Sequence, residues 1–169
     1  LHYCMKGLLR MEKFRKRTYQ GLGEFWHDLR FILRNQKRIR AIFKGKPLSP
    51  AFRERMMLAV THVNNCRYCA SFHTKAAMAE NISREEINAF LAGRFDDCPQ
   101  EELTGVLYAE HWAETLGKPD KEIRDKMIGE YGQEKADDID LVLGVIKTGN
   151  CTMNSIESLL HRISFGRWG

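Results

Sequence analysis

Every periodic segment of this 169-residue chain repeats its apolar residues at the spacing of an α-helix, and none alternates apolar and polar residues at a period of two. β-Branched residues are scattered along the chain instead of being gathered into runs of strand length. The pattern therefore predicts an all-α fold, a single-domain helical bundle with no sheet. The chain is long enough, and with 43% hydrophobic residues apolar enough, to bury a substantial core.

Turn and capping residues divide this pattern into separate helices. The segment Gly45–Pro50 contains two prolines and a glycine, which predicts a connection, with Ser49 capping the helix that follows. Asn64-Asn65 predicts a short break, and Ser83-Arg84-Glu85-Glu86 is a capping box. We expect helices over about residues 51–64, 66–80, 83–91, 100–116, 119–130, 136–148 and 151–163, with Gly149-Asn150 separating the last two.

The charge is distributed unevenly along the chain. Residues 1–46 contain 13 Lys and Arg against 3 Asp and Glu, whereas the remainder contains 14 against 19. We therefore expect a basic amphipathic N-terminal helical segment over residues 1–46, followed by a helical domain over residues 47–169. The apolar stripe of the basic segment consists of Leu22, Phe25, Trp26, Leu29, Ile32, Leu33, Ile39 and Phe43.

Three interpretations of the basic segment remain open. The helix lies on an anionic membrane surface, or it contacts nucleic acid, or it packs on its own core or on a neighbouring subunit. No nucleic-acid-binding motif accompanies the charge, which disfavours the second interpretation. A long apolar face also needs a partner surface, which favours a homo-oligomer.

Five cysteines, Cys4, Cys66, Cys69, Cys98 and Cys151, indicate a reducing compartment. Their number is odd, and their density is too low for a secreted disulfide scaffold. The first residues lack the features of a signal peptide, and no run reaches the roughly 18 apolar residues of a membrane span. We therefore expect a cytoplasmic protein.

The run Cys66-Arg67-Tyr68-Cys69-Ala-Ser-Phe-His73 carries the chemistry of the chain. On a helix, all three of Cys66, Cys69 and His73 lie close to one face. A helix N-terminus at Cys66 stabilises a thiolate, and His73 is placed to take the proton of Cys69. The Tyr68 hydroxyl could pass a proton.

Two other interpretations of this run are a zinc site and a pair of buried structural cysteines. Zinc would have three ligands here, but no second Cys/His pair follows at zinc-finger spacing. A thioredoxin domain is excluded, because its Cys-x-x-Cys follows a strand in a βαβ pattern.

The stretch Glu54-(x11)-Cys66-x-x-Cys69-x-x-x-His73 resembles the signature of the alkylhydroperoxidase D-like proteins of the carboxymuconolactone decarboxylase superfamily. The resemblance extends in helix layout over about residues 47–165. It implies that the two cysteines cycle between dithiol and disulfide while peroxides are reduced. Cys69 would meet the peroxide, Cys66 would resolve the product, and Glu54 with His73 would relay the proton.

Tyr68 departs from alkylhydroperoxidase D itself, which has a histidine just before the second cysteine. Tyrosine is a poor base at pH 7, because its unperturbed pKa is near 10.

The resemblance implies a thiol-dependent peroxidase or disulfide oxidoreductase that forms trimers or hexamers. A dithiol carrier or a thioredoxin-like protein would reduce it, and no organic cofactor or metal is required. The alternatives are a decarboxylase or lactone-processing enzyme, which in this superfamily generally lacks the Cys-x-x-Cys, and a non-enzymatic protein that binds a membrane or a partner.

His62 precedes Cys66 by four residues and either contributes to the site or packs between helices. His111 is expected to be a packing or surface residue, and Cys98 to be incidental. Cys151 is either a third thiol near the site or an inert buried cysteine, which is the commoner case.

Overall fold

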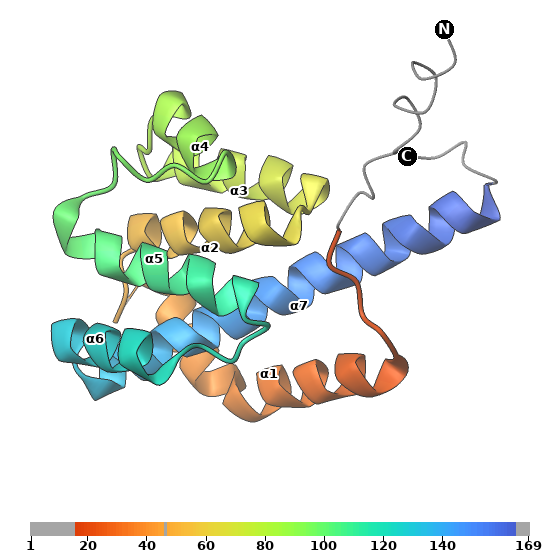
Figure 1. Cartoon of the computed structure of the whole chain (residues 1–169), viewed down its shortest axis with the longest axis horizontal. Coiled ribbons are helices and arrows are strands. Elements are labelled where there is room, and N and C mark those ends of the chain that lie inside the picture. Colours follow the sequence, from red (N-terminus) through yellow and green to blue (C-terminus); the bar gives the residue numbers. More distant parts are fainter. Residues whose placement is uncertain (1–15, 46, 165–169) are drawn as a thin grey trace, which may run out of the picture.

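A computed structural model describes residues 16–45 and 47–164, which form seven α-helices and no strand (Figure 1). The prediction of an all-α fold is confirmed. Cys4 and the first part of the basic segment lie outside the described residues. None of the described helices is long and apolar enough to cross a bilayer. The helices are α1 (Leu22–Phe43), α2 (Pro50–Asn64), α3 (Arg67–Ala79), α4 (Arg84–Leu91), α5 (Gln100–Glu114), α6 (Lys121–Tyr131) and α7 (Gln133–Ile163).

The predicted caps are present at two helix starts. The Ser49 hydroxyl accepts a hydrogen bond from the backbone N–H of Phe52, at 3.1 Å, and Ser83 accepts one from Glu86, at 3.0 Å. In a capping box the Glu86 carboxylate would bond back to the backbone N–H of Ser83. Here that carboxylate pairs with Arg55, at 2.6 Å. The predicted break between α2 and α3 is made by Asn65, whose backbone is left-handed with φ of 51°.

The predicted break at Gly149-Asn150 is wrong, because α7 runs without interruption from Gln133 to Ile163. Asn150 is fully buried, and its side chain bonds two residues of α2. It accepts from Asn64 Nδ2 at 3.0 Å and donates to Thr61 Oγ1 at 3.3 Å. These tertiary hydrogen bonds hold the segment helical, although glycine in a helix interior costs about 1 kcal/mol relative to alanine.

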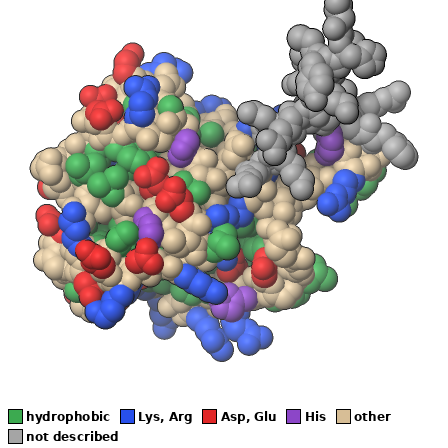
Figure 2. All heavy atoms as spheres, viewed as in Figure 1, with side chains coloured by type: hydrophobic (Ala, Val, Ile, Leu, Met, Phe, Trp, Pro, Cys, Tyr) green, Lys and Arg blue, Asp and Glu red, His purple; other side chains and the backbone are tan. Residues whose placement is uncertain are grey.

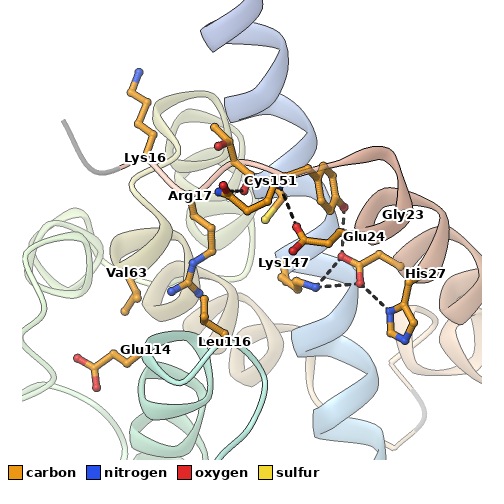
Figure 3. A pocket seen from close by; sticks show the side chains of 14 residues that line it. Lys16, Arg17, Gly23, Glu24, His27, Val63, Glu114, Leu116, Lys147 and Cys151 are labelled. Carbon is orange, nitrogen blue, oxygen red and sulfur yellow. Dashed lines mark hydrogen bonds and ion pairs between the residues drawn. The ribbon is translucent and has the colours of Figure 1, made fainter. Parts of the chain in front are cut away.

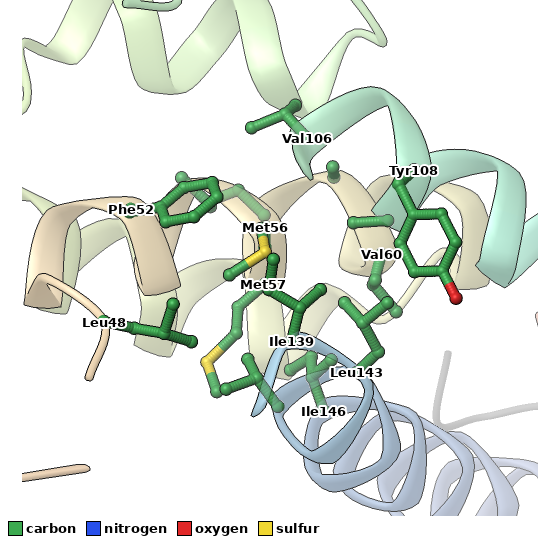
Figure 4. Close-up of a cluster of buried hydrophobic side chains, with 14 of the residues drawn as sticks. Leu48, Phe52, Met56, Met57, Val60, Val106, Tyr108, Ile139, Leu143 and Ile146 are labelled. Carbon is green, nitrogen blue, oxygen red and sulfur yellow. The ribbon is translucent and has the colours of Figure 1, made fainter. Parts of the chain in front are cut away.

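Helix α2 lies at the centre of the fold, packed against α3, α4, α5 and α7. It is buried on nearly all sides, so its polar residues are enclosed with its apolar ones. Met56 and Met57 fill the core, and Figure 4 shows them between α5 and α7. The other large core side chains include Leu48, Phe52, Val60, Val106, Tyr108, Ile139, Leu143 and Ile146.

Helix α1 packs along α7 through one face. Gly144 of α7 allows close approach, since a Cβ at this position would lie 2.4 Å from Cε1 of Phe31. The contact is flanked by two ion pairs, Asp28 with Lys147 at 2.7 Å and Arg38 with the buried Asp138 at 2.6 Å. The interpretation of a helix packed on its own core therefore holds for this face.

The opposite side of α1 remains exposed. Leu22, Trp26 and Leu33 are all more than half accessible in the single chain. Figure 2 shows Lys and Arg side chains gathered along the edge of the molecule where α1 lies.

The Gly144→Ala substitution tests the close contact between α1 and α7. The added methyl group collides with the Phe31 ring, so we expect a loss of about 1–3 kcal/mol in the free energy of unfolding. Gly149→Ala is the matched control, because open space surrounds that position in the same helix, and it should be neutral or stabilise by about 0.5–1 kcal/mol. Urea unfolding measures both, and equal stabilities for the two variants would contradict the packing described.

Candidate active site

The two cysteines are positioned by the start of α3. The left-handed Asn65 ends α2 and turns the chain, so that Cys66 becomes the N-cap of α3. Its sulfur accepts a hydrogen bond from the backbone N–H of Cys69, at 3.3 Å. The predicted placement of Cys66 at a helix N-terminus is confirmed. Both thiols are free and buried, with exposed fractions of 1% for Cys66 and 8% for Cys69.

The two thiols differ in acidity. The pKa of Cys66 is lowered, first by a hydrogen bond from the Cys69 thiol and then by the backbone N–H groups of Cys69 and Tyr68. The pKa of Cys69 is raised, because its proton is held by Cys66 and because burial disfavours its charged form. Near neutral pH the dithiol therefore consists of a partly ionised Cys66 beside a protonated Cys69, and Cys69 needs a base to become a nucleophile.

Glu54 and His73 form a buried pair across α2 and α3. The distance from Glu54 Oε2 to His73 Nδ1 is 2.7 Å, which confirms the prediction that these residues lie within reach of each other. A carboxylate only accepts hydrogen bonds, so Nδ1 carries the proton and Nε2 remains as the base of the neutral ring. Because His73 follows Cys69 by one helical turn, the base and the thiol share one face of α3.

Arg53 is a site neighbour that sequence reasoning missed. Next to Glu54 in the chain, it reads as a solvated charge, yet its side chain is buried. It donates to the backbone carbonyl of Ile42 at 3.1 Å and lies 4.6 Å from the centre of the Phe43 ring. Its Nε is 4.0 Å from the Glu54 carboxylate, which gives this buried acid a cationic neighbour besides its bond to His73.

A cavity of about 430 Å³ opens beside Cys69 and His73. Most of its wall is apolar and comes from α1, α2, α3 and α7. Sequence analysis did not identify the apolar residues of this wall as part of the site, because they are indistinguishable from core or surface residues until the helices are placed. The lining residues are Phe43, Met57, Tyr68, Cys69, Phe72, His73, Val145, Ile146, Gly149 and Met153.

Tyr68 lies at the rim of this cavity and is 43% exposed. Its hydroxyl accepts a hydrogen bond from Arg67 at 3.2 Å, and the guanidinium also lies over its ring. The hydroxyl is thus held by a cation at the cavity mouth.

Asn150 is the other residue that sequence reasoning missed. Besides its bonds to α2, its side chain acts on Cys69, where it partly offsets the raised pKa of that thiol. The sequence analysis predicted a helix break at Asn150 and therefore did not place it in the site. Its position as a polar residue inside an apolar helical pattern is the signal that could have indicated a buried role.

The remaining candidates are placed as follows. His62 holds the carbonyl of Leu91 through Nδ1 at 2.9 Å and lies on the Cys66 side of the site. His111 accepts from the backbone N–H of Asp120 at 3.2 Å, which is a packing role, as expected. The described residues contain no cluster of three His, Cys, Asp or Glu side chains arranged to hold a metal ion.

Cys151 lines a different and larger cavity, of about 940 Å³, together with Arg17, Lys147 and Glu24 (Figure 3). None of Glu54, Cys66, Cys69 and His73 contributes to it. Burial raises the pKa of Cys151 to about 11.

Cys98 is half-buried, and burial raises its pKa to about 12. Cys98 and Cys151 are both protonated at neutral pH, as inert cysteines would be.

The sequence model of the carboxymuconolactone decarboxylase family matches residues 34–114, which contain the whole of the Glu54-to-His73 motif. The match begins inside α1, before the start of the resemblance found in the sequence. It supports the carboxymuconolactone decarboxylase superfamily and does not resolve the alkylhydroperoxidase D-like group within it. No curated protein and no solved structure matches the chain significantly.

The acidity of Cys66 should depend on the proton that Cys69 donates. In the wild type, alkylation of Cys66 by iodoacetamide should rise with pH through a midpoint near its lowered pKa of about 7. Cys69→Ala removes the donor, so the midpoint should move up toward that of an ordinary thiol. Cys69→Ser keeps an O–H donor and should move it less. Peptide mapping of the labelled protein measures each midpoint, and equal midpoints in all three proteins would contradict the hydrogen bond between the thiols.

Proposed function

We propose that the protein is a thiol-dependent peroxidase of the alkylhydroperoxidase D-like type. One observation carries the proposal: the second thiol of a Cys-x-x-Cys pair shares an apolar cavity with a histidine that is bonded to a buried glutamate. The arrangement supplies a nucleophile, a base and a group that orients the base. The superfamily match supports it at the coarser level.

The first step would activate and oxidise Cys69. His73 Nε2 takes the thiol proton while Glu54 holds Nδ1–H and stabilises the imidazolium. The Cys69 thiolate attacks one peroxide oxygen, the O–O bond breaks, and the leaving alkoxide takes a proton to become an alcohol. Cys69 is left as a sulfenic acid. The apolar cavity fits the carbon chain of an organic hydroperoxide better than it fits hydrogen peroxide.

The second step would form the disulfide. Cys66 then acts as the nucleophile, and the backbone N–H groups of Cys69 and Tyr68 still stabilise its thiolate after the Cys69 thiol has been oxidised. It attacks the sulfenic sulfur of Cys69, and the departing hydroxide takes a proton to become water. The peroxide has gained two electrons, which the dithiol has lost. A dithiol carrier or a thioredoxin-like protein returns them.

The dithiol disfavours the decarboxylase and lactone-processing alternatives, since neither reaction uses a redox pair. Mass spectrometry tests the choice directly. One equivalent of cumene hydroperoxide should remove two hydrogens from the reduced protein, and the loss should map to the peptide that contains Cys66 and Cys69. An unchanged mass, or oxidation only at Cys98 or Cys151, would overturn the peroxidase proposal.

The Glu54→Gln variant tests the relay. Glutamine keeps the shape of the side chain but cannot stabilise the imidazolium, so peroxide reduction should fall by roughly 10²–10⁴-fold. The fold should persist, as measured by circular dichroism. Glu130→Gln, on the exposed surface of α6, is the matched control and should retain full activity. Wild-type turnover in Glu54→Gln would remove the glutamate from the mechanism.

We also propose that the protein is a homo-oligomer, a trimer or a hexamer, in which the exposed apolar face of α1 contacts a second copy. Trp26 is 60% exposed at the middle of that face, an unusual position for a tryptophan in water. An anionic membrane surface is the competing partner, because exposed cations accompany the apolar residues.

Light scattering of Trp26→Asp tests the assembly. The wild type should have the mass of an oligomer at micromolar concentration, and Trp26→Asp should have a lower mass because it buries a charge in the contact. Leu107→Asp, at an exposed apolar residue of α5, should leave the mass unchanged. A wild-type monomer that co-sediments with vesicles containing phosphatidylserine would favour the membrane instead.

A further inference from the structure

Three polar side chains of α7 lie buried on one face of that helix. Asn150, Asn154 and Glu157 follow one another at intervals of four and three residues, with exposed fractions of 0%, 0% and 6%. A buried amide or carboxylate is costly on a helix face that apolar residues could fill, so packing alone does not explain them. Asn150 belongs to the site already described, through Cys69. The other two contact the turn that joins α2 to α3.

Asn154 joins this turn to the strap, residues 16–19, which precedes α1. Its Nδ2 donates to the backbone carbonyl of Asn64 at 2.9 Å and to that of Arg17 at 3.0 Å. The backbone N–H of Arg17 donates to the same Asn64 carbonyl, at 3.2 Å. The strap, the turn and α7 therefore meet at one carbonyl, two residues before Cys66 in the chain.

The strap is anchored to α7 on both sides of this contact. The backbone N–H of Tyr19 donates to Ser155 Oγ at 3.0 Å, and Lys16 pairs with Glu157 (Figure 1). The same carboxylate holds Arg67, the first residue of α3, with 3.0 Å between Oε1 and Nε. The turn is thus held on the side of α2 and on the side of α3.

The place of Cys66 depends on this turn. Asn65 has a left-handed backbone, with φ of 51°, which a residue with a side chain adopts only where its surroundings favour it. This conformation makes Cys66 the N-cap of α3 and brings its sulfur to 3.3 Å from the backbone nitrogen of Cys69. If the Asn64 carbonyl were released, the turn could relax and the sulfur could leave the helix terminus.

We propose that Asn154 is a positioning residue of the dithiol, which keeps Cys66 at the N-cap of α3 by holding the Asn64 carbonyl and the strap together. Asn154 and Arg17 both lie outside residues 34–114, which the family model matches. The proposal rests on the proposed function only for its effect on the resolving step, in which Cys66 attacks the sulfenic sulfur of Cys69.

The Asn154→Leu variant tests the proposal. Leucine roughly keeps the volume of the side chain and removes both donated hydrogen bonds. The Cys66 sulfur should then lose its backbone N–H groups, so the pH midpoint of its alkylation by iodoacetamide should rise from about 7 toward that of an ordinary thiol, about 8.5. Peptide mapping measures the midpoint, which, unlike the rate, does not depend on how accessible the sulfur is.

Gly144→Ala is the matched control for lost stability. It lies in the same helix and is expected to destabilise the protein through the Phe31 ring, without touching the turn. A merely structural role of Asn154 would leave the Cys66 midpoint unchanged in both variants. A positioning role raises it in Asn154→Leu alone.

A second pair of variants decides the matter if Asn154→Leu does not fold. Arg17→Pro removes the other N–H that donates to the Asn64 carbonyl, because proline has none. Arg17→Ala keeps that N–H and loses the same charge, so it is the matched control. We expect a smaller rise of the Cys66 midpoint in Arg17→Pro and none in Arg17→Ala.

Wild-type midpoints in both Asn154→Leu and Arg17→Pro, or an equal rise in Gly144→Ala, would overturn the proposal. Failure of the proposed function would look different: the midpoints would move as expected, but cumene hydroperoxide would leave the wild-type dithiol reduced. Where both hold, Cys66 should resolve the sulfenic acid more slowly in Asn154→Leu. Dimedone added with cumene hydroperoxide should then trap more Cys69 in this variant than in the wild type.

Discussion

The hydrogen bond between Glu54 and His73 is the interaction on which the rest of the site depends. It joins α2 to α3 inside the protein, with both side chains almost completely buried. A buried carboxylate is costly unless it is paired. Because α2 is buried on nearly all sides, Glu54 needs a partner inside the protein, and His73 of α3 supplies it. The same bond fixes the tautomer of His73, and with it the nitrogen that can accept a proton. Structure and proposed chemistry therefore rest on one contact.

The two thiols divide the chemistry because the start of α3 makes them unequal. Cys66 receives backbone N–H groups at the helix terminus, whereas Cys69 lies one turn further into the helix and donates its proton. The first thiol is thus ready to attack, and the second requires the Glu54–His73 pair. The apolar cavity extends this inequality, because it is lined by Cys69 and not by Cys66.

The sequence predicts those features that depend on local pattern. Helical periodicity and the turn residues located the helices, and the caps at Ser49 and Ser83 lie where predicted. The resemblance to the alkylhydroperoxidase D-like signature, and not local pattern, implied that Glu54 and His73 would meet. Asn150 shows where this reasoning ends: its hydrogen bonds to Thr61 and Asn64 hold α7 continuous, and they join residues far apart in the chain. The apolar cavity and the buried Arg53 were missed for the same reason, because only the packing of four helices creates them.

The most direct test is to trap the oxidised form of Cys69. In the Cys66→Ser variant no thiol can resolve the sulfenic acid at Cys69, so one equivalent of cumene hydroperoxide followed by dimedone should give a stoichiometric adduct on Cys69. Peptide mass spectrometry locates that adduct. An adduct confined to Cys66 in the Cys69→Ser variant, with none on Cys69 in Cys66→Ser, would contradict the account, because peroxide would then be meeting the thiol that lies away from His73.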